Sequence, residues 1–105
     1  MQDKIKAIKN HENDNVATLF GVVTAESAVK VMEKSGDCFE VKVLQDIPYG
    51  HKIAIEKIGV GDSVTKYGEE IGIATHPIAI GEHVHIQNID SARGRGDLDR
   101  KGAKK

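Results

Sequence analysis

The sequence predicts an all-β domain of short strands and hairpins, and three observations carry this prediction. Short apolar runs rich in Val and Ile recur along the chain, as in strands that bury one face. The eleven glycines lie mostly at the breaks between these runs, where tight turns need them. No apolar stripe with helical spacing extends over about ten residues. At 105 residues the chain is long enough for one domain with a modest core.

Three strands are predicted in the first part of the chain. Residues 16–20 are apolar and β-prone, and they follow the turn-forming residues 13–15. Residues 28–32 and 39–43 are separated by the Ser-Gly-Asp break at 35–37, so we expect them to pair as a hairpin. The clean alternation of 39–43 predicts one buried face and one solvated face.

Proline and glycine divide the second part of the chain. Pro48 has no N–H to give to a ladder, so residues 47–50 cannot continue a central strand. Further extended segments follow at 53–58, 64–67, 71–74, 78–80 and 83–89. The pair that flanks Gly68 predicts a second hairpin.

Two of these segments share an internal spacing. Residues 58–64 and 78–84 both read Ile, then Gly and an acidic residue, then Val, at matching positions. A repeat array needs about three or more units, and the sequence offers two. We therefore interpret them as two corners of one compact β fold.

Composition separates a folded domain from a charged end. Apolar residues become scarce after Ser91, which predicts a domain over residues 1–91 and a basic, flexible tail over 92–105. From 93 to 105 there are six basic residues against Asp97 and Asp99. No recognition motif or aromatic interleaving accompanies this charge, so we do not expect nucleic acid as a partner.

The cysteine content and the first residues indicate a compartment. Cys38 is the only cysteine, so no intrachain disulfide can form, which is typical of a reducing environment. Residues 1–10 alternate lysines with apolar residues and lack the apolar region of a signal peptide. No run approaches the roughly 20 apolar residues of a membrane span. We expect a soluble, cytoplasmic protein without a membrane partner.

The most informative polar segment is 83–88. On a continuous strand, His83, His85 and Gln87 would project from one face, with the two imidazoles ~7 Å apart at the backbone. Such a pair can bind a metal ion, hold an anionic substrate or transfer protons near neutral pH. The alternative is a solvated strand face whose polar residues are histidines.

Two further segments carry groups that could contact a substrate. After the bend made by Pro48 and Gly50, His51 and Lys52 lie side by side, and a lysine offers a point charge to a carboxylate. The alternative is an ordinary turn followed by a strand. Residues 66–69 are interpreted as a hairpin turn, with substrate contact as the alternative. His11 and His76 are expected at the surface.

The three segments together carry a family resemblance. Residues 47–52, then 66–72, then 81–88 resemble, in this order, the SAF-type small domain of the altronate/galactarate dehydratase family. The small subunits of sulfolactate sulfo-lyases are similar. The resemblance extends over residues 15–97.

This resemblance implies a compact β-clip fold and the elimination of water from a sugar hydroxy acid. It also implies a divalent metal, commonly Fe2+, and a large hydro-lyase subunit that completes the active site, so the chain is expected to be inactive alone. Two alternatives remain: a sulfo-lyase small subunit acting on sulfolactate, and a non-catalytic carbohydrate-binding module. A homo-oligomer is also compatible with it.

The resemblance also implies roles for particular residues. His83 and His85 are the implied catalytic residues and metal ligands, completed by the partner chain. The implied substrate-binding residues are His51, Lys52, Gln87 and Asn88. Many relatives have a third histidine where this chain has Gln87, and an amide is a poor metal ligand, so a complete metal site on this chain alone is not expected.

Overall fold

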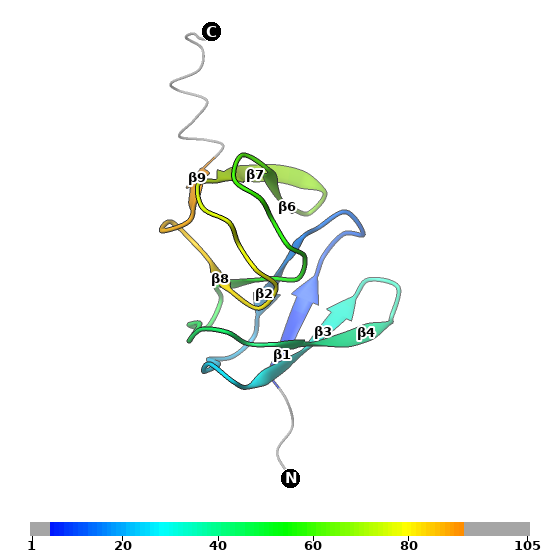
Figure 1. The fold of residues 1–105 in the computed structure, drawn as a ribbon. Helices are drawn as coiled ribbons and strands as arrows, with labels where there is room; N and C mark the ends of the chain where they lie inside the picture. Colours follow the sequence, from blue (N-terminus) through cyan, green and yellow to red (C-terminus); the bar gives the residue numbers. More distant parts are fainter. Residues whose placement is uncertain (1–4, 92–105) are drawn as a thin grey trace, which may run out of the picture.

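The computed structural model describes residues 5–91, and this part of the chain is all-β, as predicted (Figure 1). The strands are β1 (Ile5–Lys9), β2 (Val16–Leu19), β3 (Ala28–Glu33), β4 (Cys38–Lys42), β5 (Lys52–Ala54), β6 (Ser63–Lys66), β7 (Glu69–Ala74), β8 (His83–Val84) and β9 (Ile89–Ser91). Within residues 5–91 there is no helix that could cross a lipid bilayer. The predicted tail at 92–105 lies outside the described residues.

The strands form two sheets. The larger sheet has the order β4-β3-β1-β2-β5-β8, and the smaller has the order β6-β7-β9. Strand β1 runs parallel to β3 and antiparallel to β2, so the first strand lies in the middle of the larger sheet. The sequence prediction placed no strand before residue 16. Ala7 in β1 is fully buried, whereas the lysines around it dominate the composition of the segment.

Two apolar cores lie on opposite faces of β2 and β5. Ala17 and Ile53 face the core under the larger sheet, while Val16 and Ala54 face the core shared with β6 and β7. Because successive strand residues point to opposite faces, both faces of each of these two strands are buried. Strands β2 and β5 therefore connect the two halves of the molecule.

Four segments of the chain form turns of the same geometry, which we call corners. Two isolated antiparallel bridges, Val23 with Ile47 and Ile58 with Ile78, provide the first residue of each corner. Three positions later stands a residue with positive φ; these residues are Glu26, Gly50, Gly61 and Gly81. Six positions after the first residue comes a buried strand residue; these are Val29, Ile53, Val64 and Val84. Residues 58–64 and 78–84, whose common spacing the sequence showed, are thus two of the four corners.

The hydrogen bonds give each corner one geometry. In the second corner the N–H of His51 donates to the carbonyl of Pro48, which closes a β-turn with Gly50 in the left-handed region. The N–H of Gly50 donates to the carbonyl of Leu19, and the N–H of Leu19 donates to the carbonyl of His51. Two residues thus oppose one, which defines a glycine bulge of the antiparallel ladder. The same pattern occurs opposite Val43, Ala74 and Ala54.

The corners shorten two predicted strands. Strand β5 ends at Ala54, because the chain bends before Ile58 and enters the third corner. Strand β8 ends at Val84 rather than at residue 89, because residues 85–88 form a turn. The prediction that His83, His85 and Gln87 share one face of a continuous strand is therefore wrong.

A buried carboxylate joins the two sheets. Asp14, fully buried in the β1–β2 connection, accepts hydrogen bonds from the backbone N–H groups of Asn10, His11, Tyr67 and Gly68 at 2.8–3.2 Å. The last two donors belong to the β6–β7 turn. This carboxylate ties the larger sheet to the smaller one.

Candidate metal and substrate site

His51 is placed by the second corner. It is the residue after the positive-φ Gly50 (φ 83°), and its carbonyl pairs with Leu19 across the bulge. Bulges bend a strand locally and change the direction of a side chain. Ile53, two residues on, pairs directly with His83 of β8, which brings the second and fourth corners together.

His83 and His85 are placed by side-chain amides. The N–H of His83 donates to Oε1 of Gln45 at 2.8 Å. The amide of Asn88 donates to the carbonyl of His83 at 2.8 Å and accepts from the N–H of His85 at 3.0 Å. Since these groups replace ladder bonds, the chain can turn immediately after Val84 and still hold both imidazoles in place.

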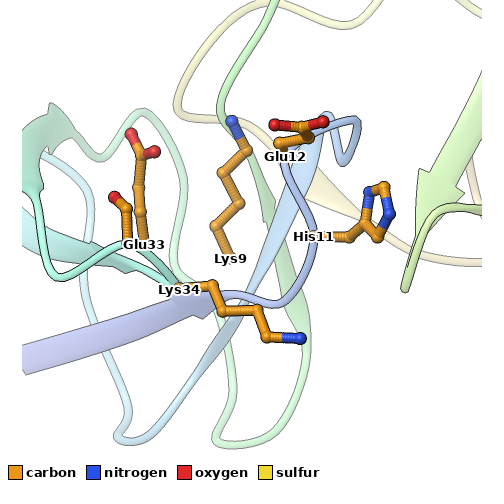
Figure 2. Close-up of a pocket in the computed structure, with 6 residues that line it drawn as sticks. Lys9, His11, Glu12, Glu33 and Lys34 are labelled. Carbon is orange, nitrogen blue, oxygen red and sulfur yellow. The ribbon is translucent and has the colours of Figure 1, made fainter.

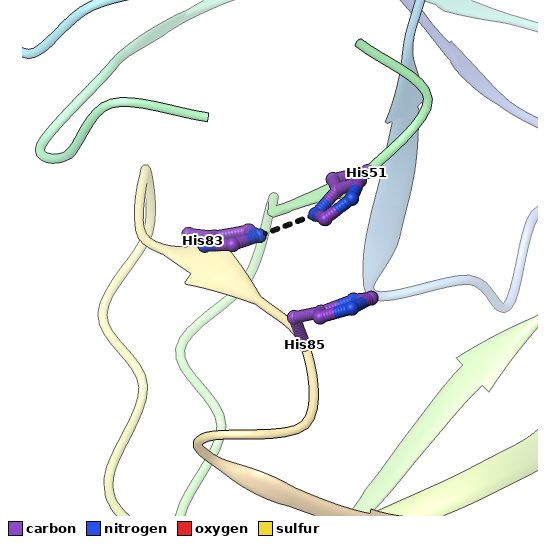
Figure 3. A group of neighbouring side chains, drawn as sticks. All are labelled: His51, His83 and His85. Carbon is purple, nitrogen blue, oxygen red and sulfur yellow. Dashed lines mark hydrogen bonds between the residues drawn. The ribbon is translucent and has the colours of Figure 1, made fainter. Parts of the chain in front are cut away.

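The three imidazoles form one cluster (Figure 3). Nδ1 of His51 lies 2.8 Å from Nε2 of His83, a hydrogen bond in which one ring carries the shared proton. The ring centroid of His51 lies 5.0 Å from that of His83 and 4.1 Å from that of His85. One nitrogen of each ring lies within 4.8 Å of the others. The third histidine that a metal site needs thus comes from the second corner, and not from position 87.

The environment favours neutral rings. Burial lowers the pKa of His83 below its ordinary value of 6.5, and the nearby His51, His85 and Lys52 lower it further. Burial also lowers the pKa of His85, together with His51 and Lys52. A neutral imidazole has a lone pair for a metal ion, whereas an imidazolium has none. The lowered pKa values of His83 and His85 therefore favour the form in which their ring nitrogens could bind a metal.

The other predicted residues surround this cluster. Lys52 is half-buried in β5, and burial followed by the charge of Lys66 lowers its pKa below 10.5. The amides of Gln87 and Asn88 both donate to the carbonyl of His83, so they contact the backbone of the histidine turn. Their predicted contact with substrate stays a prediction.

The remaining histidines are separate from the cluster. His76 is exposed and bonds to Thr75 through its side chain. His11 is partly buried: its ring accepts from the N–H of Asn13 and lies against Gly68, where an added Cβ would come within 2.9 Å of the ring. His11 therefore packs between two turns.

A hollow of about 410 Å³ lies elsewhere, at the ends of β1 and β3 (Figure 2). Its lining residues are Lys9, His11, Glu12, Glu33, Lys34 and Ser35. Two lysines and two glutamates balance in charge, and none of the predicted site residues contributes. The three histidines that the sequence named as site residues lie instead together on a partly exposed surface.

The donor set fits a divalent transition metal. Ligand atoms around a metal with bonds of ~2.1 Å are roughly 3.0–3.4 Å apart, so small side-chain rotations would bring the three nitrogens into range. Imidazole suits iron, zinc, nickel and copper, and three ligands leave positions for substrate. His51, His83 and His85 are the residues that would hold the ion.

Comparisons with known proteins match almost the whole of the part of the chain described above. Residues 5–92 match the family described as the altronate/galactarate dehydratase SAF domain. An altronate dehydratase of Bacillus subtilis (strain 168) is 42% identical over 81 residues, 77% of this chain and 15% of that protein. An altronate dehydratase of Escherichia coli (strain K12) is 38% identical over 92 residues, 88% of this chain and 17% of that protein.

A shorter relative is matched over nearly its whole length. The alpha subunit of a (2R)-sulfolactate sulfo-lyase from Paracoccus pantotrophus is 36% identical over 63 residues, 60% of this chain and 94% of that subunit. In contrast, the chain spans less than a fifth of the altronate dehydratases that it matches.

Proposed function

Because the chain belongs to the altronate/galactarate dehydratase SAF domain family, we propose that it is the small subunit of a hydro-lyase that removes water from a sugar hydroxy acid. The observation that carries this proposal is the convergence of three imidazoles from two corners of the fold. Lys52, whose charge acts on two of these rings, supplies a cation for the substrate carboxylate.

The three histidines hold a divalent metal in this proposal, and Fe2+ is the ion we propose. When bound, such an ion acts as a Lewis acid toward an oxygen of the substrate. A histidine that binds the ion cannot also carry a proton on the same nitrogen. We therefore assign His83 and His85 to metal binding and the removal of the substrate proton to a group of the partner chain.

Gln87 and Asn88 would then act through the histidines. Both amides donate to the carbonyl of His83, and Asn88 also accepts from the N–H of His85. Groups that orient metal ligands typically change metal affinity by about 10–100-fold when they are removed. Asn88 is buried, which suits a positioning role, whereas Gln87 is exposed and free to reach a substrate hydroxyl.

A large partner chain would cover the histidine surface. Ile86, next to His85, is 82% exposed, and Tyr49, two residues before His51, is 66% exposed. Apolar side chains that flank a polar site are typical of protein interfaces. The sulfo-lyase relative is named as a subunit, which supports a separate large chain. The single cysteine supports the cytoplasm as its location.

A second candidate is a sulfo-lyase small subunit. The match to the sulfo-lyase alpha subunit extends over 94% of that relative, far more than the match to any altronate dehydratase. Elimination of sulfite and of water both begin with a carboxylate beside the carbon that loses its proton. The same histidines and lysine would therefore serve either leaving group.

The test is reconstitution with defined substrates. The chain is co-expressed with a candidate large hydro-lyase chain from the same organism, purified with Fe2+ under argon, and assayed with altronate, galactarate and sulfolactate. Turnover of altronate or galactarate to a keto-deoxy acid supports the first candidate, and release of sulfite supports the second. A complex that holds no metal and converts none of the three acids would reject both.

A further inference from the structure

Two half-buried lysines act on each other by charge: Lys52 of β5, beside the histidine cluster, and Lys66 of β6, which pairs across its hairpin with Glu69. Among residues 5–91, neither ammonium group forms an ion pair; that of Lys66 lies 5.2 Å from the ring centroid of Tyr67. Unpaired like charges that are partly removed from water are costly unless an anion joins them.

The hydroxyl group of Thr18 lies on the same face of the sheet as Lys52. Thr18 of β2 is the direct cross-strand partner of Lys52, so their side chains leave the same face of the sheet with Cβ atoms roughly 4.5–5.5 Å apart. Oγ1 of Thr18 is buried and has no hydrogen-bond partner among the described residues. A buried hydroxyl usually has a partner, so this one calls for a ligand or a water.

The backbone holds β6, which carries Lys66, beside β2, which carries Thr18. The side chain of Asn15, the residue before β2, accepts from the N–H of Thr65 at 2.8 Å and donates to the carbonyl of Ser63 at 2.9 Å. The N–H of Asn15 also donates to the carbonyl of Thr65. These bonds fix the end of β6 beside the start of β2. The lysine on β6 is thus fixed in position relative to Thr18.

We propose that Lys52, Lys66 and Thr18 form a binding site for the carboxylate group of the substrate acid. Two ammonium groups would neutralise the carboxylate, and the Thr18 hydroxyl would donate one hydrogen bond to it. The site rests on the proposed function and adds Lys66 and Thr18 to it. Lys52 pairs with Val84 across β5 and β8, next to the pair of Ile53 with His83, so one hydroxy acid would be able to reach both the lysine and the metal ligands.

The first experiment measures anion binding to the 15N-labelled chain by NMR, with glycolate as the probe. The amide signals of Thr18, Lys52 and Lys66 should shift together and saturate. Lys66→Gln should weaken glycolate binding by about tenfold or more, as expected for a lost charge-assisted contact. Lys57→Gln, at an exposed lysine outside the cluster, is the matched control and should bind as the wild type does. Equal affinity in both variants would overturn the proposal.

Thr18→Val separates binding from folding. Valine has nearly the shape of threonine, so a hydroxyl without a partner should cost nothing when it is lost, and the melting temperature should hold or rise. Glycolate affinity should fall all the same. A variant that melts lower and binds glycolate normally would show that the hydroxyl has a structural role only, and would reject its part in the site.

Cobalt binding distinguishes this proposal from the proposed function. Co2+ affinity, followed by visible absorption, should be unchanged in Lys66→Gln and Thr18→Val, because neither residue is a ligand. In the assembled enzyme both variants should raise KM more than they lower kcat. Glycolate binding by a chain that holds no Co2+ would reject the metal site and keep the anion site; the reverse would reject the anion site alone.

Discussion

At the residue scale, the unexpected participant in the site is His51. The sequence predicted it as a substrate contact next to Lys52, and it stands 32 positions from His83. Its ring nevertheless hydrogen-bonds to that of His83 and stacks on that of His85. The missing signal was the corner: residues 47–53 share with 78–84 an apolar residue, then Gly three positions later, then an apolar residue at the sixth. Aligned in this way, the two segments place His51 as the second residue of a bulge.

The first prediction concerns these rings. His51→Ala should lower Co2+ affinity by about 100-fold or more, because loss of a ligand costs at least as much as loss of a group that orients one. His83→Ala and His85→Ala should behave in the same way. Isothermal titration calorimetry and visible absorption measure this directly.

Two control variants separate loss of a metal ligand from other effects of substitution. His76→Ala removes an exposed imidazole outside the cluster and should leave Co2+ affinity unchanged. Val84→Ala, between the two site histidines, should weaken the fold by about 1–3 kcal/mol through lost packing, with metal affinity per folded molecule retained. If His51→Ala binds Co2+ as tightly as His76→Ala, the cluster is not a metal site.

At the scale of single elements, the four corners explain which strands could be predicted. Strands β3, β4, β6 and β7 belong to hairpins, and alternation with a glycine break was enough to find them. Strand β8 could not be bounded, because what ends it is the amide of Asn88 bonding to the backbone of His83 and His85. Periodicity carries no information on such a contact. Strand β1 could not be found either, since its burial depends on neighbours that arrive later in the chain.

The second prediction concerns the corner that lacks glycine. Glu26 has φ 76°, whereas glycine occupies the same position in the other three corners. The left-handed conformation costs a residue with a Cβ about 1–2 kcal/mol, and glycine avoids this cost. Glycine also raises the conformational entropy of the unfolded chain, which offsets part of the stabilisation. Glu26→Gly should therefore stabilise the fold by about 0.5–1 kcal/mol in urea denaturation.

The matched control for that variant is Glu26→Ala. Both substitutions remove the exposed ion pair with Lys42, which is worth little at the surface. Only the glycine relieves the backbone. An equal effect of the two variants would mean that the backbone of the first corner is unstrained.

The third prediction concerns the carboxylate between the sheets. Asp14→Ala removes the acceptor of four backbone N–H groups and should destabilise the fold by about 2–4 kcal/mol. Asp46→Ala is the control: it removes one exposed bond to the N–H of Ala25 and should cost less than about 1 kcal/mol. Similar losses in the two variants would show that burial adds nothing to the carboxylate.

At the scale of the whole molecule, the site is open to one side. The three imidazoles are partly exposed, with Ile86 and Tyr49 exposed beside them. Sequence and family resemblance predicted that a second chain completes the site, because no complete set of catalytic groups could be recognised, and this stays a prediction. They did not predict that His51 joins His83 and His85 in one cluster, since that requires two distant corners to meet.

The fourth prediction separates binding from catalysis. The purified chain should bind Co2+ but should show no turnover of altronate or galactarate, because the proposed base for the substrate proton belongs to the partner. Addition of the large chain should restore turnover, and a chelator should abolish it again. Robust turnover by the isolated chain would show that the proposed division of roles is wrong.

The Asp14 carboxylate has a further consequence for how the molecule opens. The N–H groups of Asn10, His11, Tyr67 and Gly68 all depend on one acceptor, although they lie in two connections more than 50 residues apart along the chain. Because all four share this acceptor, any opening that moves the carboxylate exposes the four N–H groups together. In native-state hydrogen exchange the four amides should therefore report a single opening free energy, and the two sheets should separate as one event rather than one after the other.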